Sequence, residues 1–307
     1  MILSIPFLAT DVAQLDRGLL AEGHGVEATL FRGEDVMDDD RWALVRRNLR
    51  AVAALSPPSL TFHFPVEDAD WVADAAVRDR LLEALDVVGE LGFHGVVLHS
   101  NRIASHEVWR ARDLERERDA LGGALAALAR RVESSSLWVG LENMPVTGND
   151  AVDLDPLLVY PEDFAGLCGG PVGVTWDVCH YAYTTYVGES IAAGSLDHAD
   201  DYPHLRLPVR ATGATQLVPS TLHGQLRHAH LSAFTGIADR RRRTTCTEGE
   251  LPGAGPVGEQ RYADALLALR AAGVRAVTLE VQEVDYTRRR RAPEMVAWCR
   301  SVLGAAR

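Results

Sequence analysis

The stretch VGVTWDVCH, residues 172–180, is a short apolar run that closes on two residues able to bind a metal, Asp177 and His180. Five other apolar runs close in the same way: SLTFHFP (59–65), GVVLHS (95–100), VGLENMP (139–145), LRHAHLSAF (226–234) and AVTLEVQE (276–283). The six ligand-type residues are His63, His99, Glu142, Asp177, His230 and Glu280, separated by 36, 43, 35, 53 and 50 residues. Each step is close to one strand plus one returning helix, which predicts a (β/α) barrel with its chemistry at the C-terminal strand ends.

The rest of the chain continues this alternation of strand-like and helix-like segments, which favours a parallel sheet. We therefore expect a (β/α)8 TIM barrel, a single domain over residues 1–307. Strands are expected at 2–9, 26–31, 59–65, 95–100, 139–144, 172–178, 226–234 and 276–283, and helices at 12–22, 40–55, 69–91, 113–133, 161–167, 259–272 and 293–303. Two long segments, 184–225 and 235–258, are expected as loops over the C-terminal face.

The composition excludes several classes of function. A net charge of −12 gives no general attraction for nucleic acid. The four cysteines form no CxxC pair, and neither a basic leader nor a membrane-length apolar run is present, so we expect a cytoplasmic protein without disulfides or a membrane partner. All 31 basic residues are arginine, which removes lysine Schiff-base and lysine general-base chemistry. The oligomeric state stays open.

The six strand-end residues predict a metal site. In a barrel strand alternate residues point inward, and the residues two positions before the ligands are small except for His228. Glu142, Asp177 and Glu280 would repel one another at one barrel mouth, and a divalent cation relieves that repulsion. One ion would leave these three carboxylates with a net charge of −1 and two ions would leave +1, so charge does not fix the number. Mixed imidazole and carboxylate ligands suit zinc, iron or manganese.

The order of these residues resembles the xylose-isomerase-like barrel superfamily, which includes sugar-phosphate isomerases and epimerases and endonuclease IV. The resemblance covers nearly the whole chain from the second strand, and its sharpest pieces are LENM, WDVCH, HAHLS and PGAGPVG. It implies that Glu142, Asp177, His230 and Glu280 are the four metal ligands common to the isomerases and epimerases of that group.

Three histidines, His63, His99 and His180, further resemble the added histidines of the multinuclear, endonuclease-IV-like branch. There His63 and His99 would hold one ion together with a bridging Glu142, and the other carboxylates with His230 would complete a second. The Asp-x-His pair that completes a third metal site corresponds to about Thr247 and Gly249, so His180 is expected to lack partners and no third metal is predicted. His180 is then free to bind substrate or to act as an acid or base, or it only orients Asp177.

The leading functional hypothesis is a metal-dependent isomerase or epimerase that acts on a small polyhydroxylated substrate, such as a sugar or sugar phosphate. The resemblance implies that Glu142 and Glu280 both bind metal and move protons across the substrate faces. Since the chain has no lysine, these glutamates or His180 are the candidate catalytic bases. Three alternatives stay open: a non-haem iron oxygenase or oxidative enzyme that uses the added histidines, a two-metal phosphoester hydrolase, and a binding protein without catalysis.

Several further residues have two interpretations. The arginine runs 240–243 and 288–291 follow the last two strands, where they either form a solvated surface or clamp an anionic substrate. Cys179 is expected to face the barrel and to serve in packing rather than as a ligand. Residues that are candidates to line the pocket, without any ranking among them, are Glu27, Trp176, His228 and Gln282.

Overall fold

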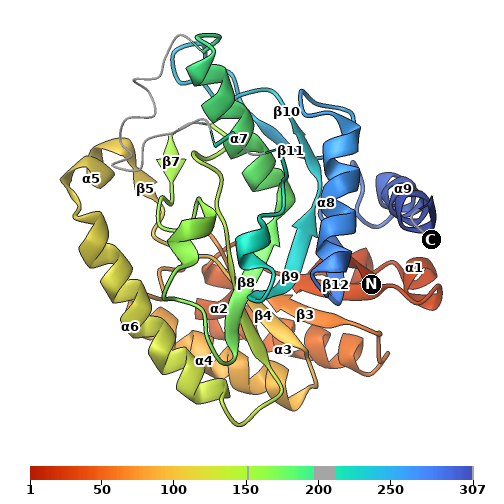
Figure 1. Cartoon of the computed structure of the whole chain (residues 1–307). Coiled ribbons are helices and arrows are strands. Elements are labelled where there is room, and N and C mark those ends of the chain that lie inside the picture. The colour runs from red at the N-terminus through yellow and green to blue at the C-terminus, as the bar shows by residue number, and fades with distance from the viewer. Residues whose placement is uncertain (151, 197–211, 214, 306–307) are drawn as a thin grey trace.

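The computed structural model describes residues 1–150, 152–196, 212–213 and 215–305. Eight parallel strands close into a barrel surrounded by helices (Figure 1). In chain order they are β1 (Ile2–Leu8), β2 (Gly25–Thr29), β3 (Leu60–His63), β4 (Gly95–Leu98), β6 (Trp138–Glu142), β8 (Val172–Asp177), β9 (Leu226–Leu231) and β12 (Ala276–Leu279). Because β1 pairs with both β2 and β12, the sheet has no open edge. The predicted (β/α)8 TIM barrel is confirmed, with small shifts at the strand ends.

The outer helices are α1 (Arg17–Ala21), α3 (Asp39–Ala53), α4 (Ala75–Glu90), α6 (Leu114–Val132), α7 (Val178–Ala192), α8 (Glu259–Ala271) and α9 (Arg291–Ala305). Aspartate side chains accept backbone N–H groups at the start of five of them: Asp16, Asp38, Asp74, Asp113 and Asp177. None of the helices in the described ranges has both the length and the apolar character needed to cross a bilayer.

Three predicted helices differ from the observed ones. The helix expected at 69–91 begins only at Ala75, because the Asp74 carboxylate caps that position. The helix expected at 12–22 is divided into a 3-10 turn, η1 (Val12–Gln14), and the short α1. The helix expected at 161–167 is only a 3-10 turn, η2 (Pro161–Phe164).

Helix α7 was not predicted, and it is the largest departure from the expectation. It starts directly after β8, where Asp177 caps it, and 11 of its 15 residues are buried. A helix buried on nearly all sides lacks the one-sided apolar period that reveals a surface helix. The first predicted long loop, 184–225, therefore begins as helix; within it, residues 197–211 and 214 lie outside the described residues.

The second predicted long loop, 235–258, contains a strand that lies near the barrel mouth. Strand β11 (Thr247–Glu250) runs antiparallel to β10 (Ala233–Thr235). A Cβ on Gly255 would stand 1.8 Å from the Phe234 carbonyl oxygen, so this position needs glycine. The Gly249 carbonyl accepts the Gln282 N–H at 2.9 Å, which ties the β10–β11 hairpin to the chain after β12.

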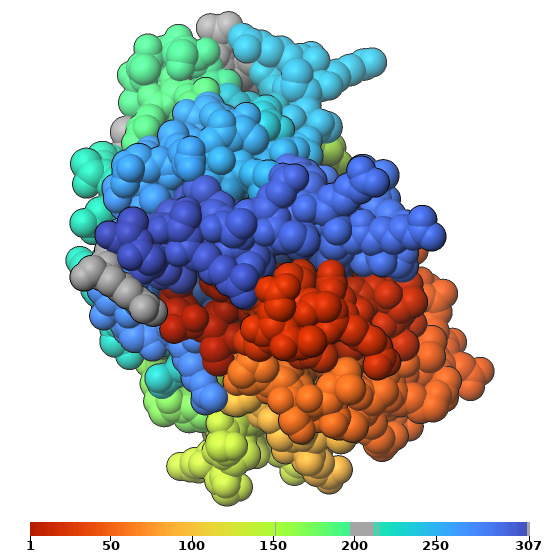
Figure 2. All heavy atoms as spheres, turned by 90° about the vertical axis from the view of Figure 1, so that its right-hand side faces the viewer, coloured from red at the N-terminus to blue at the C-terminus, as the bar shows by residue number. Residues whose placement is uncertain are grey.

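Other small elements lie outside the barrel. Strands β5 (Ala104–Ser105) and β7 (Asp153–Leu154) form a second short pair, and two short helices, α2 (Glu34–Met37) and α5 (His106–Ala111), complete the set. Figure 2 shows α9 lying against the N-terminal part of the chain, where Arg300 donates to the Glu22 carboxylate at 3.2 Å. The two ends of the chain thus meet where β1 and β12 close the barrel.

Candidate metal centre

All six predicted ligands gather at the C-terminal end of the barrel. His63, Glu142 and Asp177 are the last residues of β3, β6 and β8, while His99 and Glu280 directly follow β4 and β12. Strand register places Asp177 beside His230 of β9. The six residues form two sets that share one member: a carboxylate set of Glu142, Asp177, His230 and Glu280, and a histidine set of His63, His99 and Glu142. Within each set the ligand atoms lie within 4.8 Å of one another, as a metal ion requires.

Glu142 directs one oxygen to each set. Its Oε2 lies 3.1 Å from His63 Nε2 and 3.2 Å from His99 Nε2, whereas its Oε1 lies 3.1 Å from His230 Nδ1. The side chain is only 1% exposed, so water does not compete for these oxygens. This geometry fits a carboxylate that bridges two metal positions.

The His63 ring is held in the tautomer that a metal ligand needs. His63 Nδ1 lies 2.8 Å from the Phe64 carbonyl oxygen, which can only accept, so Nδ1 carries the proton and Nε2 keeps its lone pair. His63 Nε2 stands 3.2 Å from His99 Nε2. The Nδ1 atom of His99 contacts the Met144 sulfur. Both Nε2 atoms therefore lie close to Glu142 Oε2. All three are atoms that can bind a metal, and a cation between them would use their lone pairs.

Backbone and amide contacts hold the carboxylate set in place. His230 Nδ1 lies 3.4 Å from Glu280 Oε1 and 3.9 Å from Asp177 Oδ2. The other Asp177 oxygen accepts the His180 backbone N–H at 2.6 Å. Asn143 fixes the end of β8, since its side-chain oxygen accepts the Asp177 N–H at 2.7 Å and its amide donates to the Asp177 carbonyl at 3.0 Å. Asp177 thus presents one free oxygen to the set.

The pKa shifts of the three carboxylates show how closely their negative charges are crowded together. Burial, together with the Glu142 and Asp177 carboxylates and against the effect of His230, raises the pKa of Glu280 to about 8. Burial also raises the pKa of Asp177. For Glu142 the opposite holds, because His230 and His99 outweigh burial and keep its pKa well below the usual range. The raised pKa values of Glu280 and Asp177 indicate crowded negative charge that a divalent ion would balance.

A third group of buried ligands, Glu27, His228 and His230, lies deeper in the barrel. Glu27 Oε1 stands 3.1 Å from His230 Nε2, and Glu27 Oε2 stands 3.1 Å from His228 Nε2 and accepts the Thr61 hydroxyl at 2.8 Å. Glu27 therefore sits behind His230, on the ring edge opposite the carboxylate set. Carboxylates in this position orient metal-binding histidines. In the sequence this group is marked only by the lone acid in the apolar stretch VEATL; strand register pairs Glu27 with Thr61, whereas its contacts with His228 and His230 cross the barrel.

Three of the four predicted pocket residues are placed differently from the expectation. Glu27 and His228 are completely buried inside the barrel and do not line the pocket described below. Trp176 points outward from β8, as strand alternation requires between Thr175 and Asp177, and donates to the Leu217 carbonyl at 2.8 Å. Gln282 does line the pocket.

His180 has an acidic partner that the resemblance to the endonuclease-IV-like branch did not indicate. The expected partner positions, Thr247 and Gly249, flank Glu248, whose Oε1 lies 3.6 Å from His180 Nε2. Because side chains alternate along β11, Glu248 points to the side opposite its two neighbours. His180 Nδ1 lies 2.7 Å from the Asn143 carbonyl oxygen, so Nε2 is the atom directed to Glu248. The two family partner positions thus carry no ligand residue, and Glu248 between them is the acidic partner of His180.

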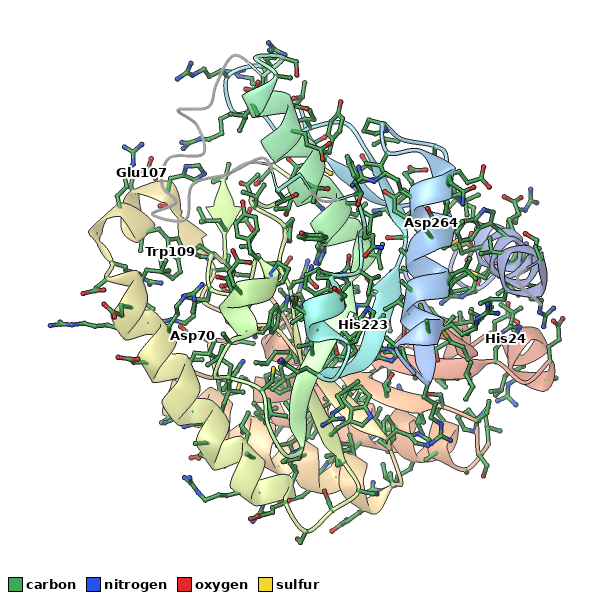
Figure 3. The ribbon with its side chains drawn as sticks, in the orientation of Figure 1. His24, Asp70, Glu107, Trp109, His223 and Asp264 are labelled. Atoms are coloured by element: carbon green, nitrogen blue, oxygen red, sulfur yellow. The ribbon has the colours of Figure 1, made fainter. Side chains whose placement is uncertain are left out.

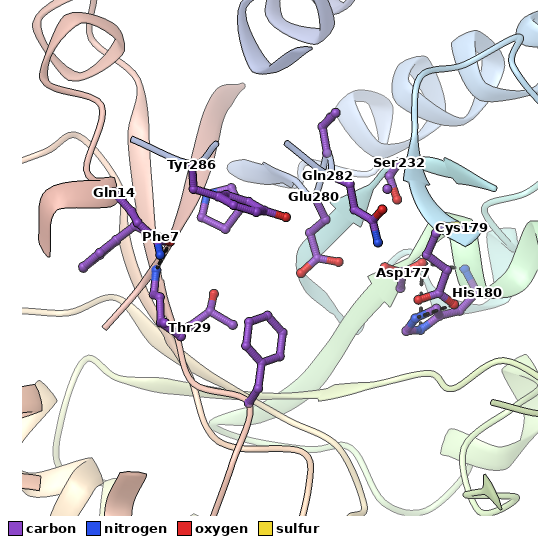
Figure 4. Close-up of a pocket in the computed structure, with 16 residues that line it drawn as sticks. Phe7, Gln14, Thr29, Asp177, Cys179, His180, Ser232, Glu280, Gln282 and Tyr286 are labelled. Atoms are coloured by element: carbon purple, nitrogen blue, oxygen red, sulfur yellow. Dashed lines mark hydrogen bonds and ion pairs between the residues drawn. The ribbon is translucent and has the colours of Figure 1, made fainter. Parts of the chain in front are cut away.

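A cavity of about 350 Å³ opens beside the carboxylate set (Figure 4). Asp177, Glu280, His180 and Glu248 line it, and so does Cys179, as expected from its place near Asp177. Glu280 is the most accessible member of the carboxylate set, with 31% of its side chain exposed. His63, His99 and Glu142 do not line this cavity.

The two arginine runs do not reach this cavity. No arginine of the described residues belongs to its lining. Arg289 donates to the Pro6 carbonyl and lies over the Tyr286 ring, and Arg291 donates to the Glu250 carboxylate at 2.5 Å. Arg240 pairs with Glu107 at 3.8 Å, far out on α5, whose place at the rim Figure 3 shows. The proposed arginine clamp for an anion is therefore not formed by these residues.

Two histidines elsewhere in the described chain lie outside the ligand groups. A histidine is therefore a candidate ligand here because of its position in the barrel and not because of its residue type alone. His24 contacts the Leu3 carbonyl at 3.2 Å beside α1, and His223 follows the 3-10 turn η4 (Ser220–Leu222); both are labelled in Figure 3. Neither belongs to a metal-ligand group.

The closed barrel with candidate metal ligands at its strand ends defines the protein as a TIM barrel, and sequence comparison agrees on the fold. The chain belongs to the xylose isomerase-like TIM barrel family, whose family model matches residues 24–302. A search of curated proteins finds no significant sequence match.

Solved structures with the same fold cover essentially the whole chain. A D-tagatose 3-epimerase-like protein is 16% identical with a TM-score of 0.60, over 100% of this chain and 99% of that one. The TTHB071 protein from Thermus thermophilus, soaked with ZnCl2, is 22% identical with a TM-score of 0.57, over 100% of both chains. The 3-keto-D-glucoside 4-epimerase from E. coli is 15% identical with a TM-score of 0.57, over 98% of this chain and 99% of that one. At these identities the likeness establishes the fold.

Proposed function

We propose that this protein is a metal-dependent isomerase or epimerase of a small polyhydroxylated substrate, and that its two ligand sets hold two divalent ions of zinc, iron or manganese. One observation carries the proposal: Glu142, Asp177, His230 and Glu280 converge within 4.8 Å at the end of the barrel, and Asp177 and Glu280 open directly onto a cavity. The epimerases among the structural neighbours support the choice of reaction class.

The bound metal would supply polarisation of adjacent hydroxyl and carbonyl oxygens of the substrate. Proton transfer then falls to residues that line the cavity. Glu280 is placed to remove the proton from the carbon beside the carbonyl, which leaves an enediolate, and to take part in its return. His180 is the second cavity-lining acid or base, because its Nε2 faces Glu248 rather than the protein backbone. Glu142 is buried behind them, and we assign it to bridging rather than to proton transfer.

Solvent exchange tests this reaction class. A protein loaded with zinc or manganese should incorporate deuterium from D2O at the carbon next to the carbonyl of an accepted keto sugar, as followed by NMR. Glu280→Gln should abolish the exchange while Cys179→Ser, a change of a neighbouring lining residue, should retain it. Turnover without any solvent exchange, or exchange that is undiminished in Glu280→Gln, would contradict the proposal.

A second candidate function, an oxidative non-haem iron enzyme, is favoured by one specific feature. His63, His99 and Glu142 form a two-histidine, one-carboxylate group, the ligand pattern of many non-haem iron oxygenases. This candidate predicts oxygen uptake by the iron-loaded protein, measured with an oxygen electrode, and turnover under strict anaerobiosis excludes it. Its weakness is that the histidine set does not open onto the cavity.

A further inference from the structure

The cavity beside the metal centre has two chemically different walls. One wall is acidic and carries Asp177, Glu280, His180 and Glu248. The other wall, here called the aromatic wall, is formed by Phe7, Phe31 and Tyr286, extended by Leu8 and Val281. Figure 4 shows Phe7 and Tyr286 on one side of the cavity and Asp177 and His180 on the other.

Barrel order explains why the two walls face each other. Phe7 belongs to β1, Phe31 follows β2 by two residues, and Tyr286 follows β12, and these three strands are neighbours in the barrel. The acidic wall comes mainly from the end of β8 and from β11. Glu280, at the end of β12, lies where the two walls meet.

The aromatic wall exposes apolar surface mainly through Phe31, while Phe7 and Val281, each 2% exposed, pack behind it. Phe31 is 56% exposed, although it directly follows a buried strand. Tyr286 is backed by Arg289, whose guanidinium carbon lies 5.1 Å from the ring centre, so the ring is held in place. Ligand pockets are usually lined by apolar side chains together with a few polar groups, and this cavity has both.

The charge of the cavity opposes an anionic substrate group. The described lining residues include three carboxylates and no arginine, and the chain has no lysine. A phosphate or carboxylate on the substrate would therefore meet attraction only at bound metal ions and at His180, and repulsion from the three carboxylates. An uncharged ring would instead lose apolar surface to the aromatic wall.

From these two walls we propose that the substrate is an uncharged molecule of two parts, a hydroxyl- and carbonyl-bearing part directed to the carboxylate set and an apolar, ring-bearing part seated on Phe31 and Tyr286. This inference rests on the proposed metal-dependent function and narrows its substrate class. The inferred substrate is then not a sugar phosphate but a sugar or polyol derivative that carries an aromatic or similarly flat apolar group.

Metal-directed probes test the aromatic wall without knowledge of the natural substrate. The zinc-loaded full chain is titrated calorimetrically with propanohydroxamate, 3-phenylpropanohydroxamate and 3-phosphonopropanohydroxamate, which share one metal-binding group and differ only in their tails. We expect the phenyl probe to bind at least about tenfold more tightly than the parent. The phosphonate probe should bind no more tightly than the parent.

Two variants and one control link this difference to the wall. Phe31→Ala and Tyr286→Ala should each reduce the phenyl-to-parent affinity ratio by at least about threefold. Val284→Ala, at a fully exposed apolar position outside the lining, should leave the ratio unchanged. Thermal unfolding and zinc content of each variant confirm that the protein is folded and loaded.

Each outcome separates the two proposals. Equal affinity of phenyl and parent probes, a ratio unmoved by both wall variants, or tightest binding of the phosphonate would overturn the aromatic wall and leave the metal-dependent function intact. Failure of all three probes to bind the zinc-loaded chain would contradict an accessible metal, and both proposals would fall together.

Discussion

The carboxylate set and the histidine set share Glu142 but differ in their access to the cavity. Asp177 and Glu280 line the cavity, and 31% of the Glu280 side chain is exposed. His63 and His99 are each only 5% exposed and lie outside the lining. Under the proposed function, this difference implies that an ion in the carboxylate set would meet the substrate, while an ion in the histidine set would neutralise Glu142 and hold it in place.

Glu142→Gln should break both sets at once and have the largest effect. A neutral amide cannot bridge two cations, so bound metal should fall below one ion per chain, and activity should fall by more than the roughly 10–100-fold loss typical of outer partners. Elemental analysis after gel filtration measures the metal content. Glu248→Gln, the same change at a cavity residue outside both sets, should retain both ions. Full metal content in Glu142→Gln would refute its bridging role.

His63→Ala should separate the two sets. It removes one ligand of the histidine set and none of the carboxylate set, so the metal content should fall by one ion per chain. Residual solvent exchange would then show that the carboxylate set works alone, whereas its loss would show that both ions are needed. His94→Ala, a histidine in neither set, is the matched control. Loss of both ions in His63→Ala would mean that the sets are not independent.

Glu27→Gln should weaken the carboxylate set selectively. Glu27 lies 3.1 Å from His230 Nε2, and loss of such an outer partner typically lowers metal affinity by about 10–100-fold. Chelator competition with cobalt, read from its visible absorption, resolves the two affinities. Glu27→Asp keeps the charge and should lose less. An equal loss in both sets would indicate a general disturbance of the barrel rather than orientation of His230.

The metal-free protein should lose stability as the pH rises from about 7 to about 8. The pKa of Glu280 is raised to about 8, so the folded state holds this proton more tightly than the unfolded chain, and that contribution disappears as pH passes through 8. The raised pKa of His230 acts in the same direction. His99 and His228, whose pKa values are lowered, act in the opposite direction, mainly at and below the ordinary histidine pKa of about 6.5.

Melting temperatures with and without a chelator measure this smaller effect. The slope should shrink in Glu280→Gln and vanish when zinc is bound, because the metal displaces the proton. A metal-free melting temperature that rises between pH 7 and pH 8 would contradict the assigned pKa direction.

Much of the fold and of the two sets could be predicted from the sequence, because each ligand closes an apolar run and all parallel strands of a barrel end on the same face. Glu142 and Asp177 illustrate this, since their place follows from strand position alone. Helix α7 could not be predicted in the same way, because burial on nearly all sides removes its apolar period.

The remaining site residues depend on contacts between distant strands. Glu248 lies on a four-residue strand without a recognisable period, and only the hairpin with β10 brings it to His180. Glu27 stands out in the sequence as a buried acid, but its meeting with His228 and His230 requires the closed barrel. The aromatic wall likewise joins the first and last strands, whose adjacency exists only after closure.

The central claim is that Glu142 bridges two metal ions, and electron paramagnetic resonance of the manganese-loaded protein tests it most directly. On titration of the metal-free chain with Mn²⁺, bridging by Glu142 predicts saturation at two ions per chain and the spectrum of a spin-coupled pair. In His63→Ala the spectrum should show isolated-ion signals only. Saturation at one ion per chain, with isolated-ion signals throughout the titration, would contradict bridging by Glu142.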